Sequence, residues 1–60
     1  MFHIVEIYGG IGETIDTKGK ANKYGTPKEF KTRKDAQAWI DKHTYAGMSH
    51  HYEIKEVEYD

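Results

Sequence analysis

The sequence predicts a small α+β domain of order β-β-α-β, with one helix packed on one face of a three-stranded antiparallel or mixed sheet. Stretches rich in β-branched and aromatic residues lie near both ends of the chain, and two adjacent glycines follow the first stretch. Between the two stretches, apolar residues recur at helical spacing. We expect all 60 residues to form this single domain, with the first strand central and the sheet order 2-1-3.

The first strand is predicted over residues 2–8, because Phe-His-Ile-Val-Glu-Ile-Tyr is dominated by strand-forming residues. Gly9-Gly10 follows at once and can supply the positive φ angles of a tight hairpin turn. A second strand, from about Glu13 to Thr17, then returns along the first.

The first two predicted strands can pair in two registers. A two-residue loop would place Glu6 directly opposite Glu13, and facing like charges destabilise a strand pair. A longer loop with a bulge would instead pair Val5 with Ile15. The charge repulsion favours the longer loop.

Residues 18–29 form a polar connection. The step Gly25-Thr26-Pro27 holds Thr26 away from helical angles, so no helix begins before it. This connection opens a basic segment, because residues 18–34 contain seven Lys or Arg against one Glu. Such a segment is either a solvated loop or a contact for phosphates or an acidic surface.

A helix is predicted from Thr32, whose hydroxyl can cap the first turn together with Asp35 at the third helical position. The helix should end near Thr44, with Gly47 in the exit loop. Residues at helical spacing form one stripe along the helix, namely Ala36, Trp39, Ile40 and His43.

The third strand is predicted from His51 to Tyr59. Its apolar residues do not alternate cleanly, so either a bulge near Lys55-Glu56 shifts the phase or both faces are partly covered. The expected core of the domain is Val5, Ile7, Ile15, Ala36, Trp39, Ile40 and Ile54.

One face of the sheet should remain open, since a single helix covers only one face. The first strand is apolar on both faces, which predicts an exposed patch and therefore an interface. We expect a bound protein partner or self-association as a homodimer there, unless the long loop with Tyr24 shields the patch. The expected contacts are Phe2, Ile4, Tyr8 and Tyr59.

No catalytic, metal or cofactor site is predicted. The four histidines lack ligand spacing, and His50 and His51 are neighbours that point to opposite faces of a strand. Gly9-Gly10-Ile11-Gly12 precedes a strand rather than the helix that a phosphate loop requires. The carboxylates Glu6 and Glu13 have no enclosed cleft in so short a chain.

The location is expected to be cytoplasmic. The chain has no cysteine, no basic segment at Met1 typical of a signal peptide, and no apolar run of the roughly 18 residues that cross a membrane. No membrane contact is expected.

Three pieces of the chain, Tyr8-Gly9-Gly10, Phe30-Lys-Thr32 with Ala36 and Trp39-Ile40, and Tyr52-Glu-Ile54, resemble short uncharacterised proteins of Gram-positive bacteria and their phages. The resemblance covers most of the chain, but the motif is structural and implies no activity. The expected function is a non-enzymatic interaction module, as in a phage or mobile-element accessory protein that binds a host macromolecule. The alternative is a small nucleic-acid-binding domain that uses residues 18–34, including Lys20, Lys23 and Lys28.

Overall fold

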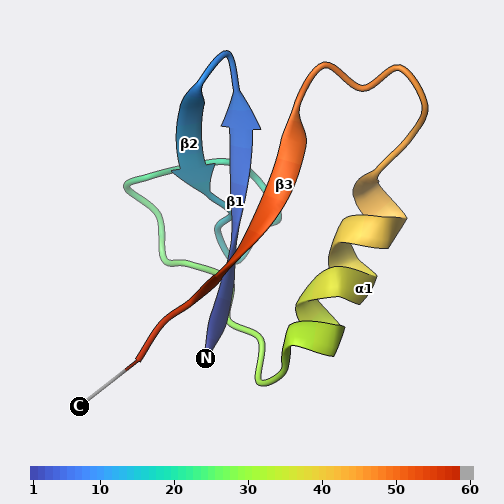
Figure 1. Cartoon of the computed structure of the whole chain (residues 1–60). Coiled ribbons are helices and arrows are strands. Elements are labelled where there is room, and N and C mark those ends of the chain that lie inside the picture. The colour runs from blue at the N-terminus through green and yellow to red at the C-terminus, as the bar shows by residue number, and fades with distance from the viewer. Residues whose placement is uncertain (59–60) are drawn as a thin grey trace.

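The computed structural model describes residues 1–58. It contains β1 (Phe2–Tyr8), β2 (Ile11–Thr14), α1 (Arg33–His43) and β3 (His51–Glu56). The strands form one antiparallel sheet in the order β2-β1-β3, and α1 packs beside β1 and β3 (Figure 1). The predicted α+β fold with a central first strand is confirmed. Within residues 1–58, no helix has the length and apolar character needed to cross a bilayer.

The β1–β2 hairpin turns through Gly9-Gly10 alone. Both glycines have positive φ, at 58° and 82°, and Tyr8 pairs directly with Ile11. A two-residue turn of this kind matches the twist of the flanking strands, and glycine adopts it without steric cost. Glu6 and Glu13 therefore do face each other. Both side chains remain partly exposed to water, which weakens their repulsion.

The predicted longer loop, with Val5 opposite Ile15, is wrong. Val5 pairs with Thr14, and the amide of Ile15 donates to the carbonyl of Ile4. The true register differs from the expected one by a single residue. Because side chains alternate between faces, this slip exchanges the two faces of β1.

The core therefore lies under the other face of β1. Ile4 is fully buried with Ile15 and Ala36, and Phe2 packs against this cluster. The prediction that Phe2 and Ile4 lie on an open face is wrong. The core predictions for Ile15, Ala36, Trp39, Ile40 and Ile54 are confirmed.

Val5 and Ile7, by contrast, were expected in the core and lie on the opposite face of the sheet. There they remain half-buried. Their cross-strand partners on β3 are Glu53 and His51, both exposed. This face is therefore not the broad apolar patch that the sequence predicts.

The helix begins as predicted. The hydroxyl of Thr32 accepts a hydrogen bond from the amide of Asp35 at 3.1 Å, and α1 ends at His43 before the non-helical Thr44. Trp39 stacks on His43, with ring centroids 3.8 Å apart, and meets Tyr52 of β3 edge-on at 5.3 Å. These contacts attach the helix to the β3 side of the sheet.

β3 is shorter than expected, because it ends at Glu56 rather than Tyr59. It pairs with β1 without interruption from Ile7–His51 to Phe2–Glu56, so the bulge near Lys55-Glu56, one of the two alternatives, is absent from the described strand. Tyr59, predicted as a contact residue, lies outside the residues that the structure describes.

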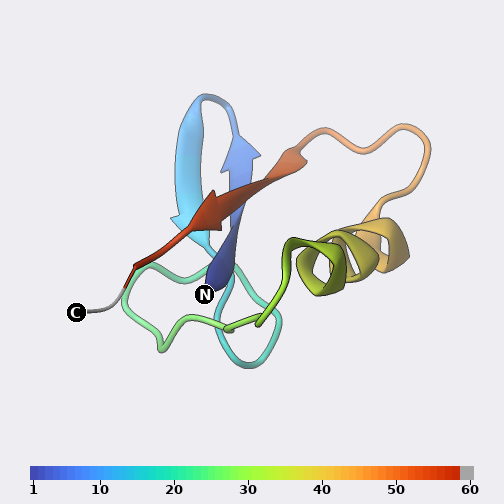
Figure 2. The same cartoon turned by 60° about the horizontal axis from the view of Figure 1, so that its bottom comes forward.

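The connection between β2 and α1 contains no helix, as predicted, but it is hydrogen-bonded throughout. Ile15 bridges to Ala21, and Phe30 exchanges two backbone hydrogen bonds with Phe2. β2 pairs with β1 only as far as Val5, and Phe30 pairs with Phe2 beyond the end of β2. Figure 2 shows this connection at the end of the sheet where β1 begins and β2 ends.

Candidate functional site

The predicted contact residues of β1 do not form a surface. Phe2 and Ile4 belong to the core, and only Tyr8, whose residue is 60% exposed, is available to a partner. The basic contact residues lie in the connection instead. Lys20 and Lys23 are exposed there, whereas Lys28 is half-buried with its ammonium 5.9 Å above the ring of Phe30.

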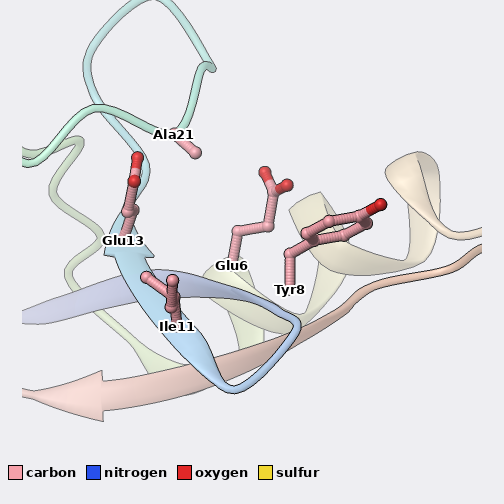
Figure 3. A pocket seen from close by; sticks show the side chains of 5 residues that line it. All are labelled: Glu6, Tyr8, Ile11, Glu13 and Ala21. Carbon is pink, nitrogen blue, oxygen red and sulfur yellow. The ribbon is translucent and has the colours of Figure 1, made fainter.

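A pocket of about 250 Å³ opens on the helix side of the β1–β2 hairpin (Figure 3). It exists because α1 covers only part of that face: among the described elements, the helix contacts β1 and β3 but not β2. We call it the glutamate pocket, and its lining residues are Glu6, Tyr8, Ile11, Glu13 and Ala21.

The tight Gly9-Gly10 turn creates this pocket. The resulting register places Glu6 beside Glu13 on one face, and Figure 3 shows both carboxylates on the same side of the hairpin. Ala21, from the connection after β2, also lines the pocket. The backbone bridge between Ala21 and Ile15 fixes its position, as does the hydrogen bond from the amide of Asn22 to the carbonyl of Thr14.

His50 stands at one edge of the pocket. Its Nε2 atom is 3.9 Å from a carboxylate oxygen of Glu6 and 3.3 Å from the hydroxyl of Tyr52. Burial raises the pKa of Tyr52, and the negative charge of Glu6 and the neighbouring Tyr45 raise it further. Tyr52 therefore stays a neutral phenol beside Glu6.

Glu13 has a different environment. Within residues 1–58 it forms no ion pair and no side-chain hydrogen bond. The carboxylate of Glu6 thus lies near His50, whereas the carboxylate of Glu13 can still accept hydrogen bonds from a ligand. Together they form a negative recess next to the ring of Tyr8.

A second, larger hollow of about 510 Å³ lies along the outer side of α1 between Arg33 and Asp41. It is shallow and open, and its side chains follow the helix surface rather than converging. The amide of Gln37 already donates to the carboxylate of Asp41 at 2.9 Å. Despite its size, this hollow is a weaker candidate than the glutamate pocket.

In the part of the chain that the structure describes, no three His, Asp or Glu side chains converge. The histidines have local contacts instead. Nδ1 of His43 lies 2.7 Å from the carbonyl oxygen of Trp39, His3 pairs with Glu29 at 3.5 Å, and His51 pairs with Glu53 at 3.7 Å.

The signal that could have located the glutamate pocket is present in the sequence. Glu6 and Glu13 are symmetrically placed around Gly9-Gly10, so a two-residue turn must bring them together. The repulsion between them argued against that register. Unfavourable local interactions are expected at functional sites, so the facing carboxylates of Glu6 and Glu13 indicate one here.

The comparisons with known proteins leave the function to be argued from this chain alone. No protein-family model, curated protein or solved structure among those compared matches it. The resemblance to short proteins of Gram-positive bacteria and their phages therefore stays a prediction.

Proposed function

We propose that this protein is a non-catalytic binding module that receives a lysine or arginine side chain of a protein partner in the glutamate pocket. The observation that carries the proposal is that Glu6 and Glu13, paired on neighbouring strands, line one pocket whose lining, among the described residues, includes no lysine, arginine or histidine. This is the kind of role expected of a phage or mobile-element accessory protein that contacts a host macromolecule.

A cationic side chain suits the pocket for three reasons. It would remove the repulsion between Glu6 and Glu13, which face each other on neighbouring strands. It would form charge-assisted hydrogen bonds with their carboxylates. The ring of Tyr8 could contact the cation, and the exposed side chain of Ile11 could cover its aliphatic stem.

The size of the pocket limits what can enter. Sites for drug-sized ligands enclose about 300–1,000 Å³, whereas this pocket measures about 250 Å³. It accommodates the end of one long side chain rather than a whole cofactor or metabolite.

The proposal is tested by titrating the protein with a Gly-Arg-Gly peptide and following backbone amide NMR shifts at low salt. We expect shifts centred on the hairpin. Glu6→Gln and Glu13→Gln should each weaken binding about tenfold or more, as expected for the loss of a charge-assisted hydrogen bond. The same peptide with citrulline in place of arginine should bind far more weakly.

Glu53→Gln is the matched control, because Glu53 lies on the opposite face of the sheet and should leave the affinity unchanged. If citrulline binds as well as arginine, or Glu53→Gln weakens binding as much as Glu13→Gln does, the pocket is not a cation site and the proposal is wrong.

A further inference from the structure

Residues 18–28, here called the basic loop, are fixed to the sheet rather than free in solvent. One carboxylate oxygen of the buried Asp16 accepts hydrogen bonds from the amides of Lys18 and Lys20, at 2.9 and 3.0 Å. At the far end of the loop, the amide of Lys28 donates to the carbonyl of Ile15. The lysines of this loop therefore project from an ordered backbone.

Tyr24 stands at the tip of the basic loop. The side-chain oxygen of Asn22 accepts a hydrogen bond from the amide of Tyr24, and the amide of Gly25 donates back to the carbonyl of Asn22. This turn fixes the backbone at Tyr24 while leaving the residue 88% exposed. The ammonium of Lys23 lies 5.2 Å from the centre of the ring.

The positive charge of the loop is largely uncompensated. Lys18, Lys20 and Lys23 are exposed, and none of them forms an ion pair with an acidic side chain of residues 1–58. The carboxylate of Asp16 is buried, and one of its oxygens accepts hydrogen bonds from the backbone amides of Lys18 and Lys20. An exposed aromatic ring thus stands beside the ammonium of Lys23 on a fixed turn, in a loop that carries two further exposed lysines.

We infer that the basic loop binds single-stranded nucleic acid, with a base stacked on Tyr24 and backbone phosphates contacted by Lys18, Lys20 and Lys23. Aromatic platforms flanked by basic side chains are how proteins hold single strands without reading sequence. Lysines alone would serve an acidic protein surface equally well, but an exposed ring at a fixed tip specifically suits an unpaired base. A duplex conceals its base faces, and the loop offers no helix or ribbon to enter a groove.

The affinity should be modest and strongly dependent on salt. Non-specific binding of this type has dissociation constants of about 10⁻⁴ to 10⁻⁶ M, and a net charge of −1 supplies no long-range attraction to the strand. Each phosphate contacted by a lysine adds about −0.7 to the slope of log affinity against log salt for a single strand.

The test is fluorescence anisotropy with labelled oligothymidylate and oligouridylate of about twelve nucleotides, a length within the range bound by small single-strand modules. Salt is varied from about 20 to about 200 mM. Tyr24→Ala should weaken binding about tenfold or more with little change in the salt slope. Lys20→Gln combined with Lys23→Gln should reduce the magnitude of the slope by about 1.4.

Two controls match these variants in residue type and exposure. Tyr45→Ala removes another exposed tyrosine, and Lys42→Gln combined with Lys55→Gln removes two exposed lysines outside the loop. Both should leave the affinity nearly unchanged. Glu6→Gln and Glu13→Gln should not weaken the oligonucleotide complex, so this test is independent of the glutamate pocket.

The inference is overturned by any of three results: no binding to either oligonucleotide at the lowest salt, equal losses in Tyr24→Ala and Tyr45→Ala, or a duplex bound as tightly as the single strand. Effective competition by a poly-glutamate peptide, with Tyr24→Ala unaffected, would assign the loop to an acidic protein instead. The substituted lysine and tyrosine side chains are all exposed, so these variants should remain folded.

Discussion

Ile4 is the residue on which the core of this protein depends. It is fully buried at the centre of the sheet, and it forms the buried cluster with Ile15 and Ala36. It therefore links the hairpin to the helix. A chain of this size buries little apolar surface in total, so each member of the cluster is a large share of its stability.

Replacing Ile4 with alanine should lower the free energy of unfolding by about 2–5 kcal/mol, the usual cost of deleting a buried branched side chain. Ile7→Ala, on the half-buried opposite face of the same strand, should cost clearly less. Chemical denaturation of both variants measures the difference. Equal losses would mean that the two faces of β1 contribute equally to the core.

The sequence could not decide between these two faces. Phe2 and Ile4 are as apolar as Val5 and Ile7, so alternation gives no preference. The decision rests on the hairpin register, which sets the residue that lies beside Ile15. A one-residue error there, made from the Glu6–Glu13 repulsion, reversed the core and displaced the predicted contact surface with it.

At the scale of elements, the helix was predictable because its signals are local. The capping hydroxyl of Thr32, the first-turn Asp35 and the apolar stripe all lie within a few residues of one another. The basic loop was harder to predict, because its order depends on contacts that are distant in sequence, such as the bridge between Asp16 and Pro27. Composition identifies its charge but not its rigidity.

Thr32→Ala should destabilise the protein by about 1 kcal/mol, since the first turn of α1 loses its side-chain cap. Thr17→Ala, at an exposed threonine outside the helix, serves as the control and should change stability little. Thermal unfolding followed by circular dichroism compares the two. An unchanged midpoint in Thr32→Ala would place the start of the helix elsewhere.

For the molecule as a whole, Asp16 joins the basic loop to the hairpin. The backbone hydrogen bond from Lys20 lowers the pKa of Asp16 below its ordinary value, burial opposes this shift, and the backbone hydrogen bond from Lys18 adds to the lowering. The folded state therefore favours the ionised carboxylate more than the unfolded chain does. This stabilisation is complete above the ordinary pKa of an aspartate, about 4, and is lost as the pH falls through the lower, folded-state pKa.

The melting temperature of the wild type should therefore fall as the pH is lowered from about 6 to about 3. Asp16→Asn keeps an acceptor oxygen but cannot ionise, so it should be less stable than the wild type at the higher pH. The gap between the two proteins should narrow as the pH falls. A gap that stays constant would show that the charge of Asp16 contributes nothing to folding.

The aromatic contact between α1 and β3 has a practical consequence. Trp39 is the one tryptophan of the sequence, and it is stacked on His43 and edge-on to Tyr52. The intrinsic emission of the protein therefore comes mainly from a single indole located where the helix meets the sheet. When the helix separates from β3, that indole enters water and its emission moves to longer wavelength. The protein carries its own fluorescent reporter of helix docking, and no dye has to be attached.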